Sequence, residues 1–339
     1  MNIELRSDTF TKPTPGMLEA MRSARIGDDV FGEDESTNEL QEYCARLFGY
    51  EAALYCTSGT MANQIAISCH TRPGDEIICD ALSHIYLYEG GGIAANSGVS
   101  VQLLYGDRGR ISARHVAEVI KADNPHFPQS RMVSLENTVN KGGGSCYDLA
   151  EIRKIAGLCR EKGIILHLDG ARLFNALLAN GNSPAEFGSL FDSISICLSK
   201  GLGAPMGSVL MGKKNFIHQA LRVRKRWGGG WRQSGYMAAA GLFALQQQRE
   251  RLAEDHVRAK QIAQILAKMP EVSSILPVET NIVIFYLDPS WGNSSKWISQ
   301  AAGKGILGAT FGENAVRLVS HLNFTDMDLD FFSEKMAEI

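Results

Sequence analysis

The fold assignment depends first on residues 194–207, which read ISICLSKGLGAPMG. The apolar run Ile194 to Leu198 has the length and composition of a buried β-strand. Lys200 comes two residues after its end, and Gly201 and Gly203 follow, so a turn begins where the strand ends. A lysine in this position is poorly placed for a purely structural role, although a lysine on a surface loop is the alternative. Polar residues directly after buried strands are typical of α/β sheets.

Similar apolar runs precede this one, and helical patterns lie between most of them. The six runs are residues 52–56, 76–79, 99–104, 132–135, 164–168 and 193–198. One intervening helix, residues 148–162, begins with Asp148 and Glu151 at capping-box spacing. Strands that alternate with helices predict a mainly parallel sheet covered on both faces, which is an α/β fold.

The two ends of the chain have different patterns. An extended arm, residues 3–10, leads into a short helix that Pro13 and Pro15 could start. Thr37 is expected to cap a further helix that ends at Gly49. Two helical patterns (233–250 and 255–268) precede a small α+β region (272–276, 281–287, 297–302, 316–319 and 326 onward). We therefore expect an N-terminal arm (1–26), a large domain (27–250) and a small C-terminal domain (251–339).

Composition excludes several classes of function. Lys and Arg number 34 and Asp and Glu number 37, which gives a formal charge of −3 and no electrostatic footprint for nucleic acid or an anionic membrane. No apolar run approaches the ~20 residues of a membrane span, and the first residues lack a signal-peptide pattern. The seven scattered cysteines have no CxxC spacing, so we expect a reduced, cytoplasmic protein without a metal site or disulfides.

Polar residues follow the predicted strands at several places where a ligand could bind. Ser58, Gly59 and Thr60 come after the first strand and open a helix, so their N–H groups and hydroxyls could bind a phosphate, or Ser58 could be an ordinary helix cap. Asp169 ends another strand, where a carboxylate is costly unless it is paired; capping of the next helix is the alternative.

A basic stretch, residues 222–232, contains one arginine in an unusual setting. Arg222, Arg224 and Lys225 are expected on a solvated helix face. Arg232 follows three glycines and precedes a helix, which is a good place for a phosphate contact.

These features together match the needs of pyridoxal 5'-phosphate. This cofactor requires a lysine for a Schiff base, a carboxylate at the pyridine nitrogen and an anion site for its phosphate. Lys200 and Asp169 end successive strands, so both can reach one ring, and desolvation suits a lysine to Schiff-base chemistry. Arg172, one helical turn after Asp169, could donate to the phenolic oxygen.

At this point the sequence resembles the low-specificity threonine aldolases, within the β-eliminating lyase group of fold-type I pyridoxal-phosphate enzymes. The matching segments span the chain in order: residues 5–9 (LRSDT), 27–32 (GDDVFG), 58–63 (SGTMAN), 135–138 (LENT), 168–172 (LDGAR), 198–202 (LSKGL), 228–230 (GGG), 232–235 (RQSG) and 316–321 (VRLVSH). The resemblance implies the aminotransferase-like architecture, with a large cofactor domain and a small C-terminal one.

The resemblance also implies a role for each site residue. Lys200 would hold the cofactor, His84 would stack on its ring and act in catalysis, and Asp169 would pair with its nitrogen. The phosphate would contact Ser58, Gly59, Thr60 and Arg232, with Arg232 donated across a subunit interface of a homodimer or homotetramer. Ser7, Arg172 and Arg317 would hold the substrate carboxylate. Without the resemblance, His84 reads as a helix-cap or core histidine.

Two positions depart from the family pattern. Phe31 stands where the family often has tyrosine, so a contact through that hydroxyl is lost. Val139 stands where many members have a histidine near the substrate β-hydroxyl, and His126, which we interpret as structural, does not replace it. We expect residue 139 to form a side wall of the pocket. Either His84 acts as the general base for the β-hydroxyl, or the enzyme favours substrates whose β-carbon needs less help or a more apolar pocket. We expect retained aldolase activity with weak discrimination between the threonine diastereomers.

The expected reaction is retro-aldol cleavage of a β-hydroxy-α-amino acid, with L-threonine or L-allo-threonine giving glycine and acetaldehyde. β-Elimination or racemisation on the same scaffold is the alternative within this chemistry. A cofactor-binding protein without useful turnover is a further alternative. A dinucleotide-binding dehydrogenase is disfavoured because no predicted strand is followed by GxGxxG.

Overall fold

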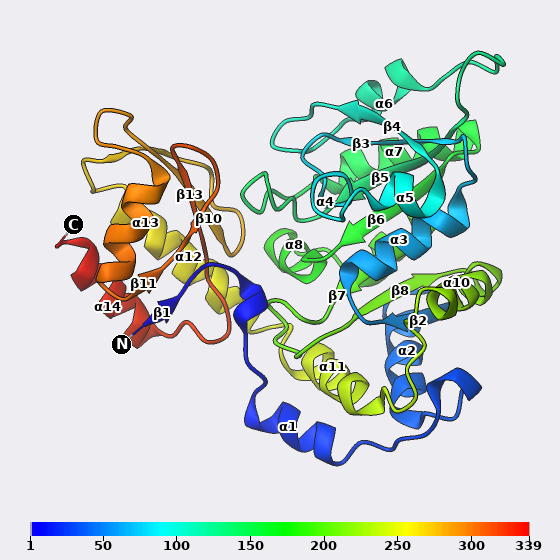
Figure 1. Cartoon of the computed structure of the whole chain (residues 1–339), viewed down its shortest axis with the longest axis horizontal. Helices are drawn as coiled ribbons and strands as arrows, with labels where there is room; N and C mark the ends of the chain where they lie inside the picture. The colour runs from blue at the N-terminus through cyan, green and yellow to red at the C-terminus, as the bar shows by residue number, and fades with distance from the viewer. Residues whose placement is uncertain (1, 339) are drawn as a thin grey trace.

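A mainly parallel seven-stranded sheet forms the centre of the larger part of the molecule, in a computed structural model that describes residues 2–338 (Figure 1). The strand order is β2-β8-β7-β6-β5-β3-β4. Six of the strands are β2 (Ala52–Cys56), β3 (Glu76–Asp80), β4 (Ser100–Leu104), β5 (Ser130–Glu136), β6 (Ile165–Gly170) and β7 (Ser193–Cys197). These match the predicted runs within two residues at each end, and the predicted α/β class is confirmed.

The remaining strand, β8 (Ser208–Gly212), is antiparallel to both β7 and β2. It was not predicted, because no helix separates it from β7. Only a turn that contains glycine and proline lies between the two strands. The pairing of β8 with β7 closes the loop that contains Lys200, so both ends of that loop are fixed in the sheet.

Helices cover both faces of this sheet. The first face is covered by α1 (Pro15–Arg22), α2 (Glu35–Phe48), α7 (Leu149–Lys162), α8 (Leu173–Asn180), α9 (Pro184–Gly188) and α11 (Gly235–Gln247). The other is covered by α3 (Gly59–His70), α4 (His84–Leu87), α5 (Gly92–Ser97) and α10 (Lys214–Arg226). Side chains along a strand alternate between these cores, since Tyr55 belongs to the first and Leu54 to the second.

One predicted helix cap is wrong, and one predicted capping box does not form. Asp34, not Thr37, caps α2, because the Asp34 carboxylate accepts the Thr37 N–H at 2.9 Å. Asp148 does cap α7, but its partner is the Ala150 N–H. Glu151 accepts instead from the Ala113 N–H, at the start of α6 (Ala113–Val119), so there is no capping box at this helix.

The smaller part has its own apolar core. It contains a four-stranded antiparallel sheet of order β12-β13-β10-β9, with β9 (Val272–Ile275), β10 (Ile282–Leu287), β12 (Ala309–Thr310) and β13 (Ala315–Val319). Three helices pack with it: α12 (Leu252–Leu266), α13 (Ser294–Gly303) and α14 (Asp326–Met336). None of the helices within residues 2–338 has the length and apolar character needed to cross a membrane.

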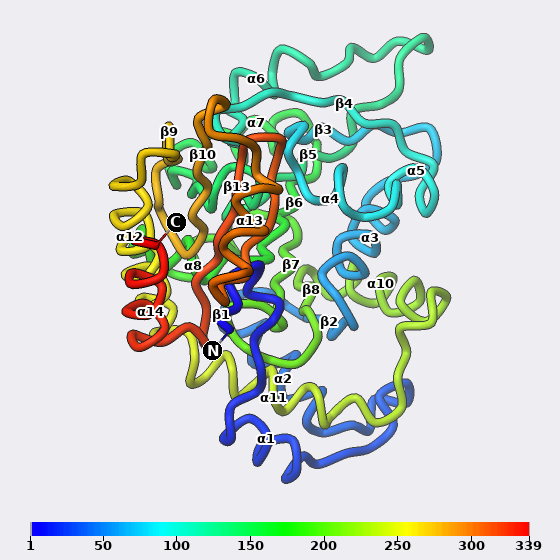
Figure 2. The backbone as a smooth tube through the Cα atoms, turned by 60° about the vertical axis from the view of Figure 1, so that its left-hand side comes forward, coloured from blue at the N-terminus to red at the C-terminus, as the bar shows by residue number. Residues whose placement is uncertain are grey.

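The N-terminal arm is anchored to this smaller part (Figure 2). Strand β1 (Ile3–Glu4) pairs in parallel with β11 (Ile306–Leu307), and the Val319 N–H donates to the Leu5 carbonyl at 2.8 Å. Ile3 and Leu5 are buried in the smaller core. Residues that follow Leu5 are thereby held between the two parts of the molecule.

Candidate active site

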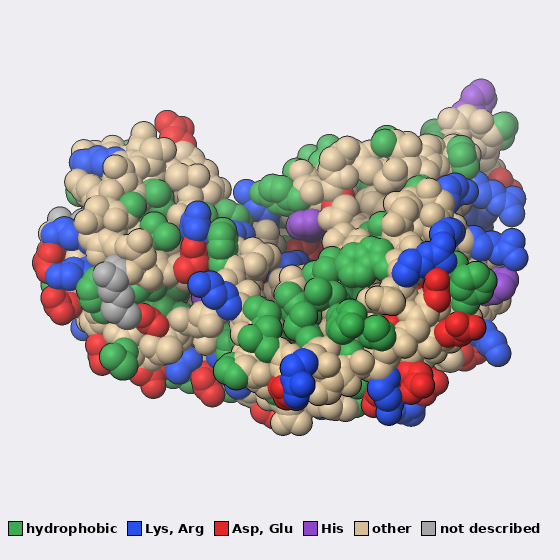
Figure 3. All heavy atoms as spheres, turned by 60° about the horizontal axis from the view of Figure 1, so that its bottom comes forward, with side chains coloured by type: hydrophobic (Ala, Val, Ile, Leu, Met, Phe, Trp, Pro, Cys, Tyr) green, Lys and Arg blue, Asp and Glu red, His purple; other side chains and the backbone are tan. Residues whose placement is uncertain are grey.

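A cavity of about 350 Å³ lies where the strand ends of the large sheet meet the smaller part. The surface is hollowed between the two parts (Figure 3). The cavity is lined by Ser7, Thr9, His84, Tyr88, Asn140, Arg172, Lys200, Thr310, Phe311 and Arg317. Five predicted site residues are therefore brought together here from the arm, three strand ends of the large sheet and β13. The carboxyl ends of parallel strands are the usual ligand-binding edge of such a sheet.

Lys200 reaches the cavity from the loop between β7 and β8. Its carbonyl accepts from the Thr11 hydroxyl at 3.1 Å and from the Gly203 N–H at 2.8 Å. Its backbone is thus held by both the arm and its own turn. The side chain lines the cavity rather than extending from an open surface loop.

Asp169 lies at the end of β6 and is 2% exposed. Its carboxylate accepts from the Asn63 side-chain amide at 2.8 Å and from the Ala171 N–H at 3.0 Å. The helix-cap alternative does not describe it, because α8 begins at Leu173 with Arg172 in the cap position. Asn63, on α3, was given no role in the sequence analysis; it orients this carboxylate and accepts from the Ser195 hydroxyl at 2.6 Å.

Arg172 forms a buried ion pair that the sequence analysis missed. Its Nε and Nη2 donate to the two carboxylate oxygens of Asp8 at 2.8 and 2.7 Å. Burial alone would raise the pKa of Asp8, but the guanidinium outweighs burial and lowers the pKa to about 2. Because Asp8 occupies one edge of the guanidinium, Nη1 is the main donor of Arg172 left for a ligand.

Arg317 reaches the cavity from β13 in the smaller part. Its Nη1 donates to the Asn140 side-chain oxygen and its Nη2 to the Arg6 carbonyl, both at 2.9 Å. Among the described residues its buried Nε has no partner. Burial and the positive charge of Arg172 lower its pKa to about 10. Two arginines thus line the cavity, and among the described residues Asp8 pairs with Arg172 whereas no carboxylate pairs with Arg317, which favours an anionic ligand.

His84 begins α4 and lines the cavity beside Tyr88. Its Nδ1 lies 3.0 Å from a carboxylate oxygen of Glu89, which is buried. Burial opposes a charge on this ring, but the Glu89 hydrogen bond and the negative charge of Asp169 outweigh burial and raise the pKa of His84. In the neutral ring, donation of Nδ1–H to Glu89 leaves Nε2 as the free acceptor.

The predicted phosphate segment lies outside the residues that line the cavity. Ser58 caps α3 by accepting the Met61 N–H at 3.1 Å. A Cβ on Gly59 would lie 2.6 Å from the Cys197 sulfur, so only glycine allows α3 to approach the end of β7 this closely. The helix N-terminus is thereby held next to the strand that leads to Lys200.

Two arginines of the basic stretch, residues 222–232, lie in different environments. Arg224 is 2% exposed, not solvated as expected, because the inner face of α10 packs on β2. It pairs with Asp29 at 2.6 Å and donates to the Tyr55 carbonyl. Arg232 is exposed, pairs with Asp28 at 2.9 Å and does not line the cavity of its own chain.

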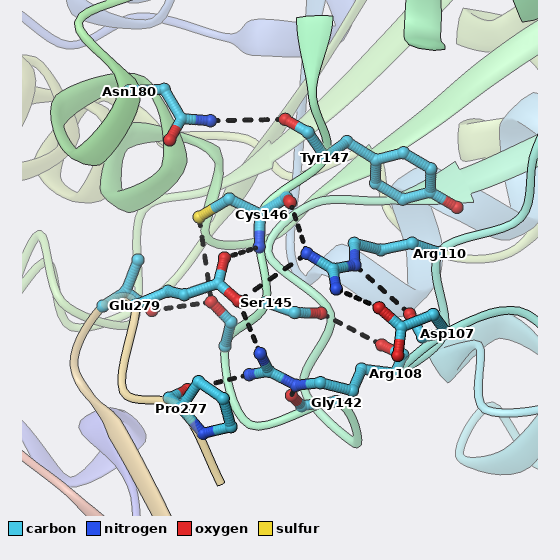
Figure 4. Close-up of polar contacts among 12 residues, drawn as sticks. Asp107, Arg108, Arg110, Gly142, Ser145, Cys146, Tyr147, Asn180, Pro277 and Glu279 are labelled. Carbon is cyan, nitrogen blue, oxygen red and sulfur yellow. Dashed lines mark hydrogen bonds and ion pairs between the residues drawn. The ribbon is translucent and has the colours of Figure 1, made fainter.

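A polar cluster attaches the two parts of the molecule beside the cavity (Figure 4). Glu279, from the smaller part, accepts from Arg108 at 2.5 Å and from the Cys146 N–H at 2.8 Å. Arg108 also donates to the Gly142 and Pro277 carbonyls, both at 2.9 Å. The loop that carries Asn140 is therefore fixed to both parts.

Comparisons with known proteins agree with this geometry. A match to the β-eliminating lyase family covers residues 4–290. The chain belongs to this family. The low specificity L-threonine aldolase of Escherichia coli K12 is 39% identical over 338 residues, which cover 99% of this chain and 97% of that protein. Low-specificity L-threonine aldolase 1 of Arabidopsis thaliana is 38% identical, over 97% of this chain and 94% of the relative.

Solved structures related to the β-eliminating lyase family share the fold. Leishmania major threonine aldolase superposes with a TM-score of 0.84 at 20% identity, over 98% of each chain. A putative L-allo-threonine aldolase from Listeria monocytogenes has a TM-score of 0.81 at 22% identity, over 96% of this chain and 93% of that one. The predicted fold-type I aminotransferase-like architecture is confirmed.

Val139, the main departure from the family pattern, does not form a wall of the cavity. Its side chain is 1% exposed within the main apolar core. A Cβ on Gly109 would lie 2.5 Å from its Cγ1, so the valine packs directly on that backbone. Its neighbour Asn140 lines the cavity instead. The expectation that residue 139 forms a side wall of the pocket was therefore wrong, because its side chain packs in the apolar core.

Val139→His is therefore expected to destabilise the protein rather than to tune selectivity. A larger, polar ring in this apolar site should lower the free energy of unfolding by about 1–3 kcal/mol, measured by urea denaturation. Val139→Thr, which keeps the side-chain shape, is the control and should cost less. Unchanged stability in Val139→His, together with an altered ratio of rates for the threonine diastereomers, would contradict the buried placement. It would indicate that the side chain at position 139 faces the cavity.

Proposed function

We propose that this chain binds pyridoxal 5'-phosphate in the cavity and cleaves β-hydroxy-α-amino acids, so that L-threonine or L-allo-threonine gives glycine and acetaldehyde. The observation that supports this most strongly is the set of groups on one cavity: the Lys200 amine, the His84 imidazole and two arginines, of which Arg317 has a buried nitrogen with no partner among the described residues. The names of the full-length relatives support the same reaction.

The residues present fit the cofactor. Lys200 would hold it covalently, and the buried Asp169 would pair with its ring nitrogen, since Asn63 and Ala171 satisfy only part of the carboxylate's accepting capacity. Its phosphate would bind at the α3 N-terminus, through Ser58, Gly59 and Thr60. When bound, pyridoxal phosphate supplies an electron sink for the pair released at the substrate Cα.

The remaining roles belong to side chains that face the substrate. Arg317, with Ser7 and the free Nη1 of Arg172, would bind the carboxylate and so fix which Cα bond is oriented to break. His84 would accept the β-hydroxyl proton at Nε2, because its Nδ1 is held by Glu89. Arg172 is buried and Ser7, His84 and Arg317 are partly buried, so the reduced access of water strengthens their interactions with the substrate.

Rates with three substrates test this proposal. The purified protein, supplied with pyridoxal phosphate, should release aldehyde from L-threonine, L-allo-threonine and a phenyl-bearing β-hydroxy amino acid. Binding of pyridoxal phosphate should produce near-visible absorbance, and borohydride should bleach it. A dinucleotide-binding protein would show neither the absorbance nor the bleaching. Release of ammonia and a keto acid without glycine would indicate β-elimination, and inversion at Cα would indicate a racemase.

We also propose that the active unit is a homodimer or homotetramer with shared sites. Arg232 is exposed and does not line the cavity of its own chain, as expected of a phosphate ligand donated to a neighbour. Apolar side chains gather on one face of the larger part in Figure 3, and Phe31 is 73% exposed.

Mixing two inactive variants tests the shared sites. Lys200→Ala and Arg232→Ala proteins, mixed under conditions that exchange subunits, should regain part of the wild-type turnover, because a hybrid contains one site with both residues intact. Exchange verified by mass spectrometry without any recovered activity would contradict a shared site.

We further propose the division into an arm (1–26), a large domain (27–250) and a small domain (251–339), with the protein in the cytoplasm. The core clusters support a boundary near residue 250, since Leu252 still packs in the main core whereas Ala259 packs in the smaller one. All seven cysteines are unpaired thiols, and six of them are buried, which is compatible with a reducing compartment.

A further inference from the structure

Glu136, the last residue of β5, accepts two backbone N–H groups at the edge of the cavity. Its Oε2 accepts from the His84 N–H and its Oε1 from the Asn140 N–H, both at 2.8 Å. The residue is 5% exposed and does not line the cavity itself. Each oxygen of this one carboxylate therefore holds the backbone of a different residue that does.

These two residues belong to different walls of the site. His84 begins α4 on the large sheet, and its ring is fixed by Glu89. Asn140 lies after β5, and its side-chain oxygen accepts from Nη1 of Arg317 in the smaller part. A continuous path of hydrogen bonds thus runs from the His84 backbone through Glu136 and Asn140 to Arg317.

We propose that Glu136 is a positioning residue that sets the spacing between His84 and Arg317, and so selects amino acids whose β-hydroxyl and carboxylate reach both at once. This inference rests on the proposed function, because the two ends of the path are its proton acceptor and its carboxylate-binding residue. A substrate bound by Arg317 presents its β-hydroxyl to His84 only if the two walls keep their separation.

The surroundings of Glu136 indicate that stability alone does not explain a carboxylate here. It lies in register with Asp169 on the next strand. Burial and the negative charge of Asp169 raise the pKa of Glu136 to about 7, although the two N–H donors and His84 act against them. Two carboxylates placed side by side in a buried site carry an electrostatic cost, which is typical of functional positions.

Glu136→Gln is the direct test. The variant keeps the size of the side chain, but its amide has one accepting oxygen, so either the His84 or the Asn140 N–H faces an NH₂ group and loses its partner. We expect faster hydrogen–deuterium exchange in the peptide with residue 84 or 140, and a kcat/KM for L-threonine reduced about tenfold or more, mainly through KM.

The chain offers a matched control in Asp80→Asn. Asp80 ends β3, beside β5, is 3% exposed and also accepts two backbone N–H groups, from Leu82 at 2.8 Å and Gly106 at 2.6 Å. Neither donor lines the cavity. Asp80→Asn should therefore change hydrogen–deuterium exchange only near residues 82 and 106. Its KM for L-threonine should stay within about twofold of wild type.

Two further readouts separate this inference from the proposed function. Glycine, which has a carboxylate but no β-hydroxyl, should slow exchange in the His84 peptide of the wild-type protein loaded with pyridoxal phosphate, and should fail to do so in Glu136→Gln. Calorimetry that detects no glycine binding to the wild type would contradict the proposed function. The role of Glu136 would be overturned if glycine slowed exchange in the His84 peptide equally in the wild type and in Glu136→Gln. It would also be overturned if Glu136→Gln and Asp80→Asn lost kcat/KM to the same extent.

Discussion

Lys200→Ala is expected to abolish covalent cofactor attachment and to reduce turnover by at least about a thousandfold. Lys200 is the amine that the β7–β8 loop holds in the cavity wall. The variant should still fold, because its backbone contacts do not involve the side chain. Borohydride reduction of the loaded wild-type protein, followed by peptide mapping, should place the pyridoxyl group on residue 200.

Lys141 provides the matched control for this assignment. Its Nζ lies 4.1 Å from the ring centre of Phe311, which lines the cavity, so it is a competing amine close to the site. Lys141→Ala should retain the label and most of the turnover. A pyridoxyl group found on Lys141, or on Lys225 of α10, would show that Lys200 is not the attachment point.

Arg317→Ala is expected to raise KM for L-threonine by about 10- to 100-fold, with a smaller loss of kcat. A hydrogen bond to a charged group contributes ~1.5–3 kcal/mol, and the same contact orients the bond that breaks. Arg172 cannot fully replace Arg317, because two of its nitrogens already donate to Asp8. Steady-state kinetics over a wide range of threonine concentrations measures the change.

Arg317→Lys separates charge from geometry in this prediction. Lysine keeps the positive charge but lacks the planar fork that can hold a carboxylate and Asn140 together, so its KM should lie between those of wild type and Arg317→Ala. A KM in Arg317→Ala equal to that of wild type would assign the carboxylate to Arg172 instead.

The sequence predicted the strands of the large sheet because each is a short buried run bounded by turn residues. It did not reveal β8, whose antiparallel pairing depends on contacts with β7 and β2 that are distant along the chain. Cap positions were less predictable, since Asp34 and Thr37 are both good caps and only the backbone geometry decides between them.

The strand-end positions of two proposed site residues could be predicted, whereas the side chains that pair with the site residues could not. Lys200 and Asp169 stand out because a charged group ends an apolar run. Asp8 and Glu136 act through long-range contacts, and each lay within a segment that the sequence analysis quoted without a role. Arg224 was misjudged because a basic run shows which residues are charged but not which face of α10 packs on the sheet.

The proposed function requires that this site break the Cα–Cβ bond of a β-hydroxy amino acid. Its most direct test is the joint measurement of glycine and acetaldehyde from L-threonine, together with α-proton exchange of alanine in heavy water. The wild-type protein should give glycine and acetaldehyde in equal amounts, and Lys200→Ala should give neither product. Exchange of the alanine α-proton without any cleavage of threonine or allo-threonine would contradict the proposed function and would favour a racemase or an eliminating lyase.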